Sequence, residues 1–286
     1  MVPYAPTRGI DAKLDVPYGD GGIDTTLDVF SPEGTAGPLP TVVWIHGGAW
    51  ISGHKEDVNP YAEIIASHGY ITVSVNYTVA PEQKYPVAVK QLNTALGFLI
   101  SHADEYNIDT NRIVVAGDSA GAQLTSQLAN MVTNPSFVKT MDIKPALLPK
   151  QLAGVILNCG IYDVSGIPDA PGIGGWGFRI SLWAYLGKRD WAHTAGGEQM
   201  STSDYVTSDF PRTWISGGND DPLTASQSKP LAAKLRELGV PVTSVFYEQD
   251  HVPALPHEYQ FHLDFQEAKD ALDSTLSFLE SVTGSN

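Results

Sequence analysis

Cysteine is almost absent from this chain of 286 residues, in which Cys159 is the only one. A single cysteine excludes a disulfide within the chain, so nothing in the composition points to an oxidising compartment. Cys159 ends the apolar run AGVILNC, where a cysteine is more typical of a buried small side chain than of a nucleophile. We therefore expect Cys159 to be packed in the core.

Positive charge and long apolar runs are also scarce. The chain has 17 Lys and Arg against 32 Asp and Glu, a formal net charge of -15. Such a chain cannot neutralise a row of phosphates, which excludes nucleic acid as a partner and argues against an anionic membrane surface. No apolar run approaches the ~20 residues that span a bilayer. The N-terminal segment MVPYAPTRGIDAK lacks the apolar centre of a signal peptide, so a cytoplasmic protein is expected.

From residue 40 onward, strand-like and helix-like segments alternate. Runs rich in β-branched residues predict strands at 41–46, 70–77, 112–117, 153–159, 212–218 and 242–247. Most of these runs are apolar throughout, which is typical of strands covered on both faces. Helical patterns occupy 60–68, 86–106, 120–132 and 228–238. The alternation predicts an α/β fold with a mostly parallel, doubly wound sheet.

The two ends of the chain complete this single predicted domain, residues 1–286. The segments 12–19 and 25–32 predict a pair of strands that form an antiparallel N-terminal edge of the sheet. A final helix is predicted from an apolar stripe that consists of Phe265, Ala268, Leu272, Leu276 and Leu279. Asp264 with Glu267 resembles a capping box at the start of that helix.

Residues 160–211 interrupt the alternation, because they contain no predicted strand and are rich in Gly and Pro. Connections of this length are uncommon in compact domains unless they are functional, for example as lids. The segment carries five large aromatic residues: Trp176, Phe178, Trp183, Tyr185 and Trp191. We expect a small aromatic-rich cap over a binding site.

The segment GDSAG, residues 117–121, lies between a predicted strand and a predicted helix. This is the arrangement of a nucleophile elbow, in which Ser119 sits on a strained turn and Gly117 and Gly121 let strand and helix approach. The five-residue pattern is weak by itself, and its placement makes it informative. A phosphate-binding glycine loop is the alternative, but the chain lacks both G-x-G-x-x-G and a P-loop lysine at this point.

The segment HGGAW, residues 46–50, follows another predicted strand. Acyl transfer through a serine creates an oxyanion that needs preorganised donors, and a glycine-rich loop can supply backbone N–H groups. Gly47 and Gly48 would allow close approach of the substrate. His46, at the end of a buried strand, is expected to have a structural hydrogen-bonding role.

Together, HGGAW, VNYTVAPEQKYPVAVKQ (75–91) and GDSAG resemble the hormone-sensitive-lipase-like branch of the α/β-hydrolase esterases, from about residue 25 to the C-terminus. The resemblance implies the α/β-hydrolase fold and hydrolysis of small carboxylic esters without a metal or cofactor. It also implies that the oxyanion donors are the N–H groups of Gly48, Ala49 and Ala120. Ala49 stands where the family usually has a third glycine, a modest departure because only its N–H is needed.

A serine nucleophile needs a base and an orienting carboxylate, which in this fold follow it in the order Asp, then His. After the predicted strand 212–218, both Asp220 and Asp221 are available, and the family's pattern of an acid directly before Pro-Leu favours Asp221. Three histidines follow the last predicted strand: His251, His257 and His262.

Position distinguishes these three histidines. His251 has the spacing of family members with a short loop, whereas His257 has the family's distance to the final helix and a following aromatic residue. His262 is too close to the helix. The resemblance therefore favours His257, with the segment DHVPAL as an insertion that could shape the site entrance.

The expected activity is that of a carboxylesterase for short-acyl esters that works through an acyl-enzyme, with a small ester as its partner. The expected substrate-binding residues are Gly47, Trp50, Trp176, Phe178 and Trp183. An arylformamidase-like amide hydrolase and a catalytically silent hydrolase-fold binding protein remain alternatives. The natural substrate and a possible homo-oligomer stay open.

Overall fold

The computed structural model describes residues 1–167 and 172–284. Their strands form one eight-stranded sheet in the order β1-β2-β4-β3-β5-β6-β7-β8. The strands are β1 Ile10–Pro17, β2 Thr26–Pro32, β3 Leu39–Ile45, β4 Ile71–Val75, β5 Ile108–Asp118, β6 Leu152–Asn158, β7 Thr213–Gly217 and β8 Val242–Phe246. Strand β2 is antiparallel to both β1 and β4, and the remaining pairs are parallel. The predicted mostly parallel sheet with an antiparallel N-terminal edge is confirmed.

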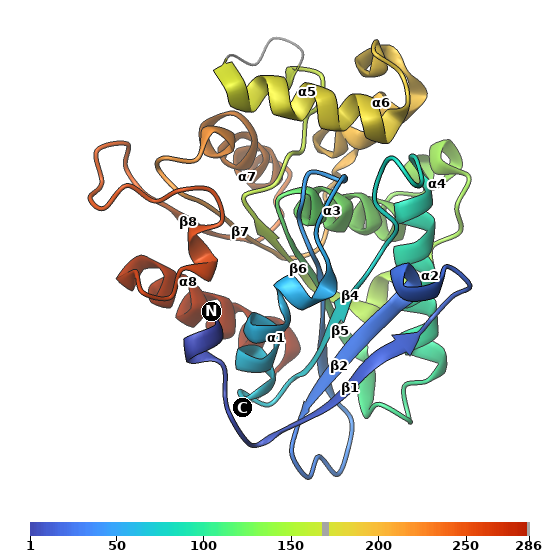
Figure 1. Cartoon of the computed structure of the whole chain (residues 1–286), viewed down its shortest axis with the longest axis vertical. Helices are drawn as coiled ribbons and strands as arrows, with labels where there is room; N and C mark the ends of the chain where they lie inside the picture. Colours follow the sequence, from blue (N-terminus) through green and yellow to red (C-terminus); the bar gives the residue numbers. More distant parts are fainter. Residues whose placement is uncertain (168–171, 285–286) are drawn as a thin grey trace.

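Helices cover both faces of the sheet (Figure 1). They are α1 Asn59–Ala66, α2 Val87–Ser101, α3 Ala120–Thr133, α4 Pro135–Met141, α5 Gly172–Leu186, α6 Ala195–Met200, α7 Lys229–Glu237 and α8 Gln266–Thr283. Helices α1 and α8 pack on one face and α2, α3 and α7 on the other. No helix among the described residues has the length and apolar character that crossing a bilayer requires.

Strand β3 shows why the predicted strands are apolar throughout. Its alternate side chains Val43 and Ile45 belong to the larger hydrophobic core, on the face of α2 and α3. Val42 and Trp44 belong to the second core, on the face of α1 and α8. Because successive side chains of a strand point to opposite faces, a strand covered on both faces needs apolar residues at every position.

The predicted capping box of the last helix is wrong. Helix α8 has Phe265 as its N-cap, without a side-chain hydrogen bond, and Asp264 lies outside the helix with its side chain exposed. The Glu267 carboxylate instead accepts a hydrogen bond from Nε2 of His251 at 2.8 Å. His251, from the preceding loop, therefore pairs with Glu267, which the sequence pattern had assigned to the cap.

The long connection between β6 and β7 contains no strand within its described residues, and its residues 168–171 lie outside the described part of the chain. Helices α5 and α6, drawn in yellow in Figure 1, lie above one end of the sheet. Tyr185 and Trp191 of this segment are buried in the larger core. The ring of Tyr185 stacks on Trp50 with 5.8 Å between centroids, which fixes the cap to the loop after β3.

Candidate active site

Ser119 stands alone between the end of β5 and the start of α3. Its φ of 51° and ψ of −116° lie in a region that residues with a side chain rarely occupy. The flanking glycines make this turn possible. A Cβ at Gly117 would lie 2.8 Å from the Ala122 nitrogen, and one at Gly121 would lie 2.6 Å from the His46 oxygen. Backbone strain of this kind concentrates at functional sites, where the surrounding structure maintains it.

Ser119 is hydrogen-bonded in series with two side chains from distant parts of the chain. Its Oγ lies 3.0 Å from Nε2 of His257, and Nδ1 of the same ring lies 2.9 Å from Oδ2 of Asp221. A carboxylate can only accept, so Nδ1 carries the proton and donates it to Asp221. Nε2 of the neutral ring is then the acceptor for the Ser119 hydroxyl. This tautomer is the one that a general base requires.

Asp221 is held in place by burial and by its own hydrogen bonds. Its side chain has no exposed surface, and Oδ1 accepts the Leu223 N–H at 2.9 Å. The neighbouring Asp220 is exposed. Only one of the two candidate aspartates therefore faces the histidine.

Opposing effects act on the pKa of the His257 ring. Burial lowers the pKa of the ring, but contact with the Cys159 sulfur and the hydrogen bond to Asp221 raise that pKa, and the net shift is upward. Burial also raises the pKa of the Cys159 thiol, which leaves that group neutral near pH 7. The Asp221 carboxylate is therefore the charge that stabilises an imidazolium at His257.

The three histidines of the last loop occupy different places. His257 contacts Ser119, whereas His251 is paired with Glu267 and packs on the ring of Tyr247 with 4.6 Å between centroids. Residues 250–255 do not line the cavity next to Ser119, and Val252 is 85% exposed, so the expectation that this segment shapes the entrance is wrong. His262, for which the sequence suggested no chemistry, does line the cavity.

The loop after β3 is held against the Ser119 elbow by a buried carboxyl group. Asp118 accepts the Gly47 N–H at 2.8 Å through Oδ2 and the Trp44 indole N–H at 2.8 Å through Oδ1. Burial, together with the nearby Glu258, raises the pKa of Asp118 well above its ordinary value. Sequence reasoning missed this role, although Asp118 lies inside the GDSAG motif.

Positive φ angles shape the loop itself, with values of 103° at Gly48, 52° at Ala49 and 62° at Trp50. Gly48 and Ala49 border the same cavity as Ser119. Among the described residues, no hydrogen bond occupies the N–H groups of Gly48, Ala49 or Ala120. Three unsatisfied donors next to a serine hydroxyl can bind an anionic oxygen.

His46 is buried at the base of this loop. Nδ1 donates to the Gly47 oxygen at 2.8 Å, and the ring stacks on Tyr77 with centroids 4.3 Å apart. Burial lowers the pKa of His46 to about 4, so the ring is neutral at neutral pH. These contacts fit the structural role that its position predicted.

The cavity at Ser119 has a volume of about 690 Å³. Of the five residues expected to bind substrate, Gly47 and Phe178 line it. Trp50 does not, because its side chain is fully buried and its indole N–H donates to Gln123 at 3.1 Å. Trp176 is 59% exposed, and Trp183 lines a separate cavity beside Arg189. Contrary to the prediction, Trp50, Trp176 and Trp183 therefore do not line this cavity.

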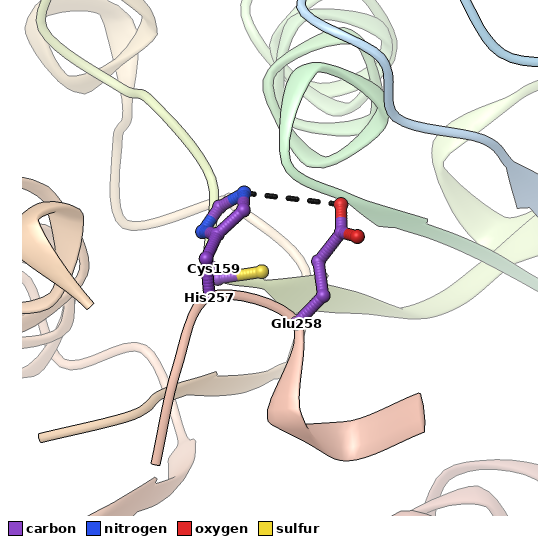
Figure 2. Close-up of side chains that lie close together, drawn as sticks. All are labelled: Cys159, His257 and Glu258. Carbon is purple, nitrogen blue, oxygen red and sulfur yellow. Dashed lines mark ion pairs between the residues drawn. The ribbon is translucent and has the colours of Figure 1, made fainter. Parts of the chain in front are cut away.

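Figure 2 shows a possible metal-binding group at this site, formed by Cys159, His257 and Glu258. One potential ligand atom from each lies within 4.8 Å of the others, and the described residues contain no other such group. However, both ring nitrogens of His257 are already engaged by Ser119 and Asp221. A metal here would have to break the bond to Ser119, so the group fits proton transfer better than metal binding.

Comparison with known proteins places this geometry in a family. The sequence matches the BD-FAE family over residues 27–235. A putative alpha/beta hydrolase R526 of Acanthamoeba polyphaga mimivirus is 31% identical over 246 residues, covering 81% of this chain and 65% of that protein. Esterase LipQ of Mycobacterium tuberculosis is 26% identical over 235 residues, covering 80% of this chain and 54% of that protein. The chain therefore spans less than two thirds of the length of these relatives.

Solved structures agree on the fold. Esterase B from Lactobacillus rhamnosis superposes with a TM-score of 0.85 at 21% identity, covering 96% of this chain and 87% of that one. A bacterial heroin esterase gives a TM-score of 0.75 at 24% identity, covering 97% of this chain and 86% of that one. The sheet, the elbow at Ser119 and the match over most of the sequence lead to one conclusion. This chain has the α/β-hydrolase fold and belongs to the BD-FAE family.

Proposed function

We propose that this chain is a serine carboxylesterase in which Ser119, His257 and Asp221 form the catalytic triad. The observation that carries the proposal is the continuous hydrogen-bonded series from the Ser119 hydroxyl through both nitrogens of His257 to Asp221. The names of similar proteins, which include esterase LipQ and esterase B, support ester hydrolysis.

In the proposed mechanism, His257 takes the Ser119 proton as the hydroxyl attacks the ester carbonyl carbon. The carbonyl oxygen becomes an oxyanion and accepts hydrogen bonds from the N–H groups of Gly48, Ala49 and Ala120. Asp221 holds the imidazole and stabilises its charged form. His257 then gives its proton to the leaving alcohol, and the acyl group remains on Ser119. Water, deprotonated by His257, attacks this acyl-enzyme and releases the carboxylic acid.

The substrate is proposed to be a small ester with a short acyl chain. The cap segment 160–211 supports this proposal because it contributes Phe178 to the cavity while Tyr185 and Trp191 fix it to the core. A cap fixed by buried aromatic residues is not expected to move aside to admit a long chain. We further propose that residues 1–286 form one domain, since all the described strands belong to one sheet.

A fluorophosphonate probe and p-nitrophenyl acetate test the proposed function directly. The wild-type protein is expected to react with the probe and to hydrolyse the ester, and Ser119→Ala to do neither. Ser126→Ala, which removes a buried hydroxyl from the same helix away from the cavity, is the matched control. Absence of labelling in the folded wild-type protein would favour a silent binding protein.

Two substrate comparisons refine the proposed specificity. Activity should rise as p-nitrophenyl esters shorten from octanoate to acetate, and the opposite trend would contradict the short-acyl proposal. Phenyl acetate should be hydrolysed faster than N-formylkynurenine. A preference for the latter would instead identify an arylformamidase-like amide hydrolase that uses the same residues.

A further inference from the structure

Glu258, the residue directly after His257, carries a carboxylate at the site that the proposed mechanism does not use. Its backbone is left-handed, with φ 59° and ψ 28°. Figure 2 shows the side chains of His257 and Glu258 rising from one loop to the same side, joined by a dashed line. Oε1 of Glu258 lies 3.8 Å from Nε2 of His257, and 34% of the glutamate side chain is exposed. Glu258 also lines the cavity that contains Ser119.

Glu258 is the more exposed of two neighbouring carboxyl groups at the site. Asp118 is buried, and burial together with the nearby Glu258 raises its pKa well above its ordinary value. The Glu258 side chain lines the cavity and is 34% exposed. Because burial penalises a charged carboxylate, Glu258 is the carboxylate that can meet a charged substrate. Gly47 leaves space for the pair, since a Cβ there would lie 3.1 Å from Oε1 of Glu258.

His257 gives its proton to the leaving alcohol through Nε2. The Glu258 carboxylate, which lies beside Nε2, is therefore on the leaving-group side of the ester. Nε2 of His257 must come within hydrogen-bond reach, about 3 Å, of the alcohol oxygen that it protonates. The Glu258 oxygen is 3.8 Å from the same nitrogen. The carboxylate thus lies within about 7 Å of the leaving oxygen, the sum of these two separations. An ammonium group two carbons beyond the leaving oxygen can therefore approach the Glu258 carboxylate.

The remaining charges around the cavity also favour a cation. Asp57 lines the wall, and none of its described lining residues is Lys or Arg. His46 is neutral because burial lowers its pKa to about 4. The amino group of Met1 is the one ammonium among the described lining residues, and it donates to the Phe261 oxygen at 3.3 Å.

We infer that Glu258 is a specificity-determining residue that favours esters whose alcohol carries a positively charged ammonium group. This inference rests on the proposed esterase function. The carboxylate and the ammonium would attract each other across the site mouth. Opposite charges about 7 Å apart at a partly exposed site should change kcat/KM by about three- to fivefold.

The test uses two esters of matched shape, acetylcholine and 3,3-dimethylbutyl acetate, which differ in a cationic nitrogen against a neutral carbon. The ratio of their kcat/KM values is measured for each protein. Wild type is expected to prefer the charged ester about three- to fivefold, less so at high salt because screening weakens the attraction. Glu258→Gln should bring the ratio close to one, and Glu258→Asp should keep part of the preference. Asp264→Asn removes an exposed charge outside the cavity and should leave the ratio at its wild-type value.

The outcomes separate this inference from the proposed function. Hydrolysis of p-nitrophenyl acetate without a preference for acetylcholine would overturn the inference and leave the esterase intact. An equal loss for both esters in Glu258→Gln would also overturn it, since Glu258 would then act on His257 rather than on the substrate. If no ester is hydrolysed, the proposed function fails, and the inference fails with it.

Discussion

Substitution of Gly121 by alanine should separate the two parts of the site that the structure holds together. A Cβ at this position would lie 2.6 Å from the His46 oxygen and 2.7 Å from the Ile45 carbonyl carbon, and closer still to the Ile45 oxygen. All three atoms belong to the backbone at the end of β3, so no flexible side chain can move aside. Helix α3 and strand β3 are both buried, and relief requires that one of them shifts.

The expected cost of Gly121→Ala is about 3 kcal/mol or more of unfolding free energy, at the upper end for an overpacked core. Gly97→Ala is the matched control, because Gly97 is inside helix α2 and its added Cβ would meet only the Ala146 Cβ, at 3.5 Å. That contact is ordinary, and the gain in helix propensity should stabilise the protein by about 0.5–1 kcal/mol.

Urea unfolding followed by tryptophan fluorescence measures both variants, and p-nitrophenyl acetate hydrolysis measures the site. Gly121→Ala should lose most activity even at low urea, because Ser119 and the Gly48 loop are displaced relative to each other. Gly97→Ala should retain it. A Gly121→Ala protein within about 1 kcal/mol of wild type, the average effect of point mutations, would refute the close-packing argument.

Three further predictions concern the titratable groups. His257→Ala should lower kcat by about 10⁴ or more. His251→Ala should leave most activity because its ring is paired with Glu267 away from the cavity. The reverse result in an esterase assay would show that His251, and not His257, is the base. Asp221→Asn should lower kcat by about 10⁴. Asp220→Asn, at an exposed position, should leave kcat unchanged. Equal losses in the two variants would show that the hydrogen bond between Asp221 and His257 is not what supports catalysis. His46 has a pKa of about 4 when folded against 6.5 when unfolded, so it stabilises the fold above pH 6.5, and up to about 3 kcal/mol is lost as the pH falls toward 4. Urea unfolding of wild type and His46→Gln between these pH values checks this, since the variant should show the shallower decline, and parallel curves would contradict it.

The parts of the site that are local in sequence could be predicted before the structure was known. The strand, the glycines and the helix around Ser119 are contiguous, and a serine between them can adopt the required turn only with small neighbours. The order of the later loops narrowed the acid and the base to a few residues. Local patterns failed where a competing partner came from elsewhere, as at Glu267, which pairs with His251 instead of capping α8.

The sequence did not predict how the side chains in loops are oriented. Trp50 follows Gly48 and Ala49 directly, yet a positive φ turns its ring into the core, where it contacts Gln123 and Tyr185. Glu258 is likewise adjacent to His257 in the chain, and only its left-handed backbone brings its carboxylate beside the same ring nitrogen. A residue's neighbours in the sequence do not specify these backbone angles.

The sequence by itself determined the alternating α/β architecture and the position of the elbow, because periodic burial and a tight turn impose residue types at fixed spacings. Only the tertiary structure decided which histidine meets Ser119, since residues 138 positions apart come together through the packing of the whole sheet. It also brought Glu258, from the loop after β8, beside Asp118 at the end of β5, since a Cβ at Gly47 would meet both side chains.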